Sequence, residues 1–147
     1  MRDNNGIRFW ILISTSIIIL TLLLIGQTYS LINYEMAVTL GLQESVQEVG
    51  EIGIVWAKGF AFADTFVYIP LLLLGIIGLL KRKKWGLYAM FGSCAISVYW
   101  PIVHLFAIYK GKDVITLNHE KYVFFPIILS LILLYGLWGM WYLYKNK

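Results

Sequence analysis

The sequence predicts an all-α integral membrane protein, built as a bundle of four transmembrane helices. Its 147 residues are 60% hydrophobic with a mean hydropathy of +0.76, whereas a soluble domain is about 45–50% apolar. The apolar residues gather in four long runs, and a helix of roughly 20 such residues crosses a hydrocarbon core of about 30 Å. The short alternating segments typical of a membrane β-barrel are missing from the sequence.

We expect these helices at residues 9–30, 54–80, 85–109 and 122–144, within a single membrane domain that spans residues 1–147. The first run is longer than the apolar region of about 7–15 residues in a signal peptide. The "QTYSLIN" that follows it has no A-x-A-like cleavage site. We therefore predict that the first helix is retained.

The distribution of charge predicts the orientation of the four helices. Basic residues occupy the two ends of the chain and the "KRKK" loop: Arg2, Arg8, Lys81, Arg82, Lys83, Lys84, Lys145 and Lys147, with Asp3 as the one acid among them. The positive-inside rule then places both termini and this loop in the cytoplasm. We attribute the net charge of +4 to the basic residues on the cytoplasmic side of the membrane. We therefore expect no nucleic acid partner. The Ile, Leu, Lys and Asn usage suggests a prokaryotic plasma membrane.

The first outer loop, residues 31–53, carries a further helical pattern. Leu42, Val46, Val49 and Ile52 have helical spacing, while three glutamates occupy another face. This amphipathic pattern predicts a short helix on the outer surface between helices one and two.

Asp64 is the main candidate for a functional residue. An ionisable group at mid-membrane costs at least about 2.5–3.5 kcal/mol, and such groups usually face the bundle interior. Lys58 lies nearer the outer boundary, and its long stem lets it snorkel. Folding the chain about Lys83 brings Asp64 level with Trp100 to His104. We therefore predict a polar pocket between the helices around Asp64.

Counting along the other helices adds Thr21 of helix one and Ser130 of helix four at this depth, with the Gln27 amide nearer the outer surface. We expect Tyr68, Tyr99 and Trp100 to supply aromatic walls. Prolines 70, 101 and 126 fall one in each of helices two to four and predict kinks beside a cavity. Gly75-x-x-Gly78 and Gly136-x-x-Gly139 predict close helix approach at the inner end. We expect the bundle to be closed at its inner end and open on its outer side.

Helix two, "WAKGFAFADTFVYIP", resembles that of the EXPERA family, whose members include the sigma-two receptor and a sterol isomerase. The order of Trp56, Lys58, Asp64 and Pro70 carries this resemblance, with "SVYWPIVH" and "YVFFPIIL" in the next two helices. It implies a small helical bundle with a pocket for sterols or lipophilic amines. Asp64 would be the pocket acid, Glu35 would match the family's first acidic position, and Trp56 would lie at the ligand site. The family's further carboxylate and histidine are missing.

Several functions stay open at this point. The protein binds a lipophilic sterol-, isoprenoid- or amine-like molecule, or it is a membrane isomerase that uses Asp64 and His104 as an acid–base pair. A proton-coupled transporter, working as a homodimer, and a structural subunit are the other readings. The lone Cys94 excludes an intramolecular disulfide and Cys-x-x-Cys sites. His104 and His119 are too far apart for one haem, so we expect no cofactor and no metal.

Overall fold

The structure is a computed structural model that describes residues 6–113, 116–117 and 119–146, without the side chains of His119 and Glu120. The charge argument used Arg2, Asp3 and Lys147, and these three residues lie outside the described part. The haem argument used the side chain of His119, which lies outside it too.

The described chain is helical. In order, its elements are α1 (Ile7–Leu23), the π-helical turn η1 (Leu24–Thr28), α2 (Tyr29–Ile32), α3 (Tyr34–Thr39), α4 (Val46–Ala63), the π-helical turn η2 (Asp64–Tyr68), α5 (Ile69–Leu80), α6 (Lys84–Gly111) and α7 (His119–Lys145). Four stretches are long and apolar enough to cross a membrane: Ile7–Ile32, Val46–Leu80, Lys84–Gly111 and Lys121–Lys145. These four helices confirm the predicted helical, membrane-type architecture.

Helix two starts earlier than the apolar run predicted, because polar residues begin it. The Ser45 amide donates to the Glu48 carboxylate at 2.8 Å, which makes Ser45-x-x-Glu48 a capping box and starts α4 at Val46 rather than at residue 54. The backbone then bends at Gly50, whose φ of 69° is left-handed. The residues expected in an amphipathic helix are therefore divided among the connection after α3 and the first turns of α4. The short helix α3 was not predicted.

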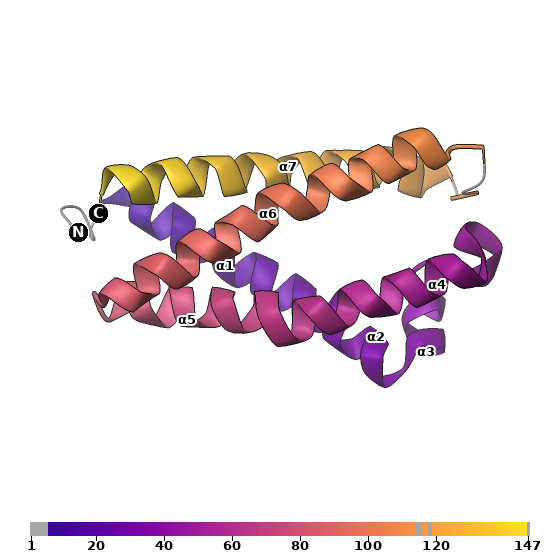
Figure 1. Cartoon of the computed structure of the whole chain (residues 1–147), viewed down its shortest axis with the longest axis horizontal. Coiled ribbons are helices and arrows are strands. Elements are labelled where there is room, and N and C mark those ends of the chain that lie inside the picture. Colours follow the sequence, from indigo (N-terminus) through magenta and orange to yellow (C-terminus); the bar gives the residue numbers. More distant parts are fainter. Residues whose placement is uncertain (1–5, 114–115, 118, 147) are drawn as a thin grey trace.

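All four helices meet at the end of the bundle that holds the two chain ends and the α5–α6 turn, which we call the terminal end (Figure 1). A Cβ added to Gly78 would overlap Gly86 of the next helix, and a Cβ on Gly136 would lie 2.7 Å from the Cys94 carbonyl oxygen. The close approach predicted from the glycine pairs is thus confirmed.

The hydrophobic core fills this terminal half. Leu12, Leu72, Leu79 and Met90 are fully buried there together with Cys94. Within this core the Ser16 and Tyr135 hydroxyl groups share a hydrogen bond of 2.6 Å, which ties α1 to α7. Polar groups buried this way need such a partner.

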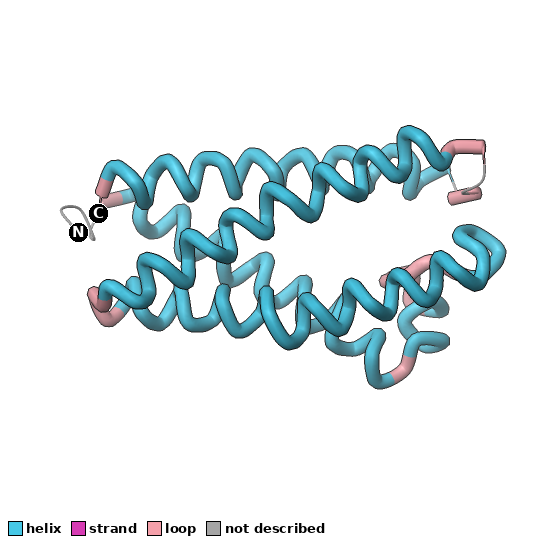
Figure 2. The backbone as a smooth tube through the Cα atoms, viewed as in Figure 1, coloured by secondary structure: helices cyan, strands magenta, loops and turns pink. Residues whose placement is uncertain are grey.

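At the opposite end, which we call the loop end, the helices diverge. Figure 2 shows α6 crossing from the side of α5 at the terminal end to the side of α7, while α4 runs apart from both. Pro101 lies fully buried inside α6, Pro126 lies inside α7, and Pro70 follows the π-helical turn η2. A proline withholds one amide from the helix ladder, which allows such bends.

The outer faces of the helices are apolar. Leu22, Phe66 and Leu134 are each more than half exposed, although they lie in the middle of their helices. A row of exposed large apolar side chains at this depth suits contact with lipid rather than with water.

Candidate functional site

A cavity of about 220 Å³ lies at the loop end between α4, α6 and α7. Its walls are mainly apolar, from Ala57, Phe60, Ile108, Phe125, Ile128, Leu129 and Ile132, with Leu42. Its polar lining comes from Gln27, Gln43, Glu44, Trp100 and His104. An apolar cavity with a few convergent polar groups is the usual form of a small-molecule site.

An aromatic cluster forms one wall of this cavity. The His104 ring lies 4.9 Å from Phe60 and 4.4 Å from Trp100, measured between ring centroids. Its Nδ1 lies 2.9 Å from the Trp100 carbonyl oxygen. Because a carbonyl only accepts, Nδ1 carries the proton, and Nε2 of the neutral ring is left as an acceptor.

Two contacts between helices two and three fix the level of Asp64. Phe60 meets His104, and two turns deeper the Tyr68 and Ser97 hydroxyl groups share a hydrogen bond of 2.5 Å. Asp64 lies one turn from both Phe60 and Tyr68. Since the helices are antiparallel, the residue opposite Asp64 at this level is Trp100 or its neighbour Pro101, as the count along the sequence indicated.

Both side chains at this level carry a buried polar atom that lacks a partner. Asp64 is 4% exposed, and within the described chain neither its Oδ2 nor the Trp100 Nε1 has a hydrogen-bond partner. An uncompensated buried polar group costs about 1–3 kcal/mol in proteins. Buried polar atoms without a partner are rare in native folds, so these two atoms require an explanation.

Asp64 also begins the π-helical turn η2, which packs against η1 of helix one. The Thr28 and Thr65 hydroxyl groups join the two turns at 3.1 Å. Single π-helical turns recur at functional sites because they widen the helix locally. This contact also corrects one estimate: Thr28, not Thr21, lies beside the Asp64 turn. Helix one is not joined to helix two by a tight hairpin, so counting residues could not align them.

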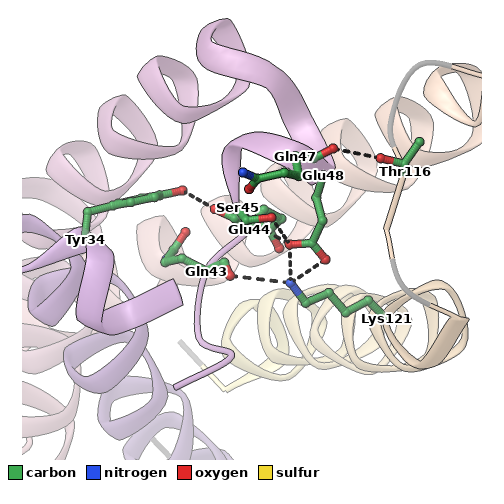
Figure 3. A network of polar contacts seen from close by, with 8 residues as sticks. All are labelled: Tyr34, Gln43, Glu44, Ser45, Gln47, Glu48, Thr116 and Lys121. Carbon is green, nitrogen blue, oxygen red and sulfur yellow. Dashed lines mark hydrogen bonds and ion pairs between the residues drawn. The ribbon is translucent and has the colours of Figure 1, made fainter. Parts of the chain in front are cut away.

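Leu42, Gln43 and Glu44 line one side of the cavity, and we call residues 42–48 the strap. The Gln43 side-chain amide donates to the Gly26 carbonyl oxygen at 3.1 Å, which fastens the strap to η1. Lys121 of α7 holds the other side, with its Nζ 3.0 Å from the Glu48 carboxylate. Figure 3 shows Lys121 reaching Gln43 and Glu48 together, with Thr116 bonded to Gln47 nearby.

Burial shifts the pKa values of two groups in and beside the strap. Burial raises the pKa of Glu44, although Lys121 opposes this shift. Burial, together with the charges of Glu44 and Glu48, raises the pKa of Tyr34 to about 12. The Tyr34 hydroxyl donates to the Glu44 carbonyl oxygen at 3.1 Å, so it is held as a neutral donor.

The predicted site residues are thus divided among four places. Gln27, Trp100 and His104 line the cavity, while Asp64 and Tyr68 are buried at deeper levels of the same helix pair. The side chains of Trp56 and Tyr99 point outward from the bundle and are 66% and 67% exposed. No hydrogen bond between Asp64 and His104 occurs in the described chain, so their acid–base pairing stays a prediction.

Glu35 lines a second pocket, of about 360 Å³, between α3 and α4. Lys58 lines the same pocket, with its Nζ 5.3 Å from the centre of the Tyr34 ring. The expected grouping of Glu35 with Asp64 in one site is therefore not seen.

The residues that sequence reasoning missed are the apolar residues of the cavity wall, the residues of the strap and the partner of the strap, Lys121. One signal was readable, since Ser45-x-x-Glu48 is a capping box. Glu48 and Lys121 are 73 positions apart in the sequence, so no local sequence pattern could predict their contact.

Fold and site together define a four-helix membrane-type bundle with a cavity at one end. Comparison with protein-family models, with curated proteins and with solved structures finds no match for this chain. The resemblance of helix two to the EXPERA family therefore stays a prediction.

Proposed function

We propose that this protein binds a lipophilic small molecule in the cavity between α4, α6 and α7. The observation that carries the proposal is the cavity itself, with apolar and aromatic walls, a few polar groups, and the strap above it. A structural subunit needs no such space, because well-packed interiors leave few voids larger than a water molecule.

The size of the cavity limits the ligand. Sites for drug-sized molecules measure about 300–1,000 Å³, and this cavity has about 220 Å³. We therefore propose that it holds a compact lipophile, or the polar end of a longer isoprenoid whose chain extends between the helices. The exposed apolar faces of α6 and α7 would accompany such a chain into lipid.

Filling the cavity tests this proposal. Ile132→Trp places an indole into the cavity lining, whereas Ile127→Trp makes the same change at a side chain that is 56% exposed and outside the lining. The probes are a panel of short isoprenoids added to the purified protein in nanodiscs, with retention read by native mass spectrometry. We expect retention by the wild type and by Ile127→Trp, and loss by Ile132→Trp. Equal retention by all three proteins would refute a binding site in this cavity.

A further inference from the structure

We propose that the pocket between α3 and α4 binds the headgroup of a zwitterionic lipid, with its phosphate at Lys58 and its ammonium group at Glu35. This pocket shares no lining residue with the cavity of the proposed function, so the inference goes beyond that function. Its volume of about 360 Å³ lies within the range of about 300–1,000 Å³ that is usual for small-molecule sites.

The position of Lys58 along helix two places the pocket at the level of lipid headgroups. Lys58 precedes Leu80, the last residue of α5, by 22 positions. At 1.5 Å per residue this is about 33 Å of helix, and the hydrocarbon core measures about 30 Å. With Leu80 at one membrane surface, Lys58 therefore reaches the other. Trp56 lies half a turn further and is 66% exposed, which is typical of an interfacial anchor.

The pocket brings together two opposite charges that do not pair. Glu35 comes from α3 and Lys58 from α4, and both line the pocket as exposed side chains. Within the described part of the chain neither forms an ion pair, whereas Glu48 and Lys121 nearby do. A zwitterionic headgroup supplies a partner for each of the two charges, and its phosphate and ammonium groups are covalently joined.

Tyr34 holds Lys58 at one wall of the pocket. The Tyr34 hydroxyl donates to the Glu44 carbonyl oxygen at 3.1 Å, which fastens the ring to the strap (Figure 3). The Lys58 Nζ lies 5.3 Å from the centre of this ring, within the range of a cation–π contact. The aromatic face attracts the ammonium group of Lys58, which can still donate hydrogen bonds to a phosphate oxygen.

Glu35 distinguishes among the common headgroups. A primary ammonium group donates hydrogen bonds to a carboxylate, whereas the quaternary ammonium group of choline has no N–H to donate. A phosphoglycerol headgroup carries only negative charge, which Glu35 repels. The headgroup that fits both residues is phosphoethanolamine. The apolar lining residues Val38, Val46 and Ile54 suit the acyl chains next to it.

The experiment offers the purified protein an equimolar mixture of phosphatidylethanolamine, phosphatidylcholine and phosphatidylglycerol with identical acyl chains. Native mass spectrometry then counts the lipids that stay bound. The variants are Glu35→Gln, Lys58→Met and Lys58→Arg. The controls are Glu51→Gln and Lys112→Met, because both residues are exposed and lie outside the pocket lining.

We expect the wild type and both controls to retain phosphatidylethanolamine about three- to fivefold more than either other lipid, the scale of one or two exposed charge contacts. Glu35→Gln should abolish this preference. Lys58→Met should retain about threefold less phosphatidylethanolamine, and Lys58→Arg should retain as much as the wild type. Because both positions are exposed, we expect thermal unfolding of these variants to match that of the wild type.

Two results would overturn the inference. One is equal retention of the three lipids by the wild type, or an unchanged preference in Glu35→Gln. The other is a preference for phosphatidylglycerol that Lys58→Met removes, since this would make the pocket a site for anionic lipid. Neither result bears on the proposed function, because Ile132→Trp tests the other cavity.

Discussion

At the scale of single residues, the chain keeps an acid where burial is costly. Asp64 is 4% exposed and lies among helices whose outer faces are apolar. A buried carboxyl oxygen without a partner is destabilising, so stability alone does not explain the presence of Asp64. The Trp100 Nε1 is likewise buried without a hydrogen-bond partner in the described part of the chain.

Glu44 provides a test of electrostatics at the cavity mouth. Burial raises its folded-state pKa above the ordinary value of 4.5. A raised pKa means that the folded state holds the proton more tightly than the unfolded state does. The resulting stability is fully present below pH 4.5 and is lost as the pH rises through the folded-state pKa.

We therefore expect Glu44→Gln to be more stable than the wild type at pH 7 and to lose this advantage at pH 4. Thermal unfolding in detergent, followed by circular dichroism at both pH values, measures the difference. The control is Glu51→Gln, because Glu51 is exposed. A Glu44→Gln protein that is less stable at pH 7 would show that the attraction to Lys121 outweighs burial.

At the scale of elements, the strap and the π-helical turns set the shape of the site. Gln43 binds the carbonyl of Gly26 within η1, and Lys121 binds Glu48 from α7. The strap therefore links helix one to helix four across the cavity. Gly50, with its left-handed backbone, lies directly after this link and gives α4 its bend.

Breaking the ion pair between Lys121 and Glu48 should loosen the strap. The Lys121 and Glu48 side chains are only 13% and 16% exposed, so the pair is shielded more than a surface pair. We expect Lys121→Met to cost about 1–3 kcal/mol of local stability. The backbone amides of residues 43–48 should exchange hydrogen faster, and a bound lipophile should dissociate faster.

Hydrogen–deuterium exchange and ligand release from nanodiscs measure these two effects. Lys112→Met serves as the control, because Lys112 is an exposed lysine in the connection that leads to the same helix. Unchanged exchange in the strap of Lys121→Met would mean that the other contacts, from Gln43 and Thr116, hold it closed alone.

At the scale of the whole molecule, the two ends of the bundle differ. The terminal end is tightly packed, with glycines where helices touch, and the loop end holds the cavity. The orientation predicted from the charges would open the cavity toward the outer side of the membrane.

Cysteine labelling tests this orientation. Cys94 is fully buried, so the wild type should stay unlabelled by a membrane-impermeant maleimide. On intact cells we expect Asp113→Cys to react and Lys83→Cys to react only after lysis. The opposite pattern would reverse the predicted topology, while the cavity and its proposed ligand would be unaffected.

The sequence alone was sufficient to predict the architecture of four long apolar helices. Long apolar runs must be helical in lipid, because every backbone polar group needs an internal partner there. The glycine pairs and the level of Asp64 against Trp100 could also be predicted, since a tight hairpin makes counting residues equivalent to measuring depth.

Only the tertiary structure decided which residues form the site. Tyr99 and Trp100 are neighbours in the chain, yet Tyr99 is exposed and Trp100 lines the cavity, because helix rotation is fixed by packing. The depth of helix one and the Glu48–Lys121 contact depend on long connections whose paths no local pattern records. Contacts between distant segments depend on how side chains pack across the whole bundle, and no local pattern in the sequence predicts that packing.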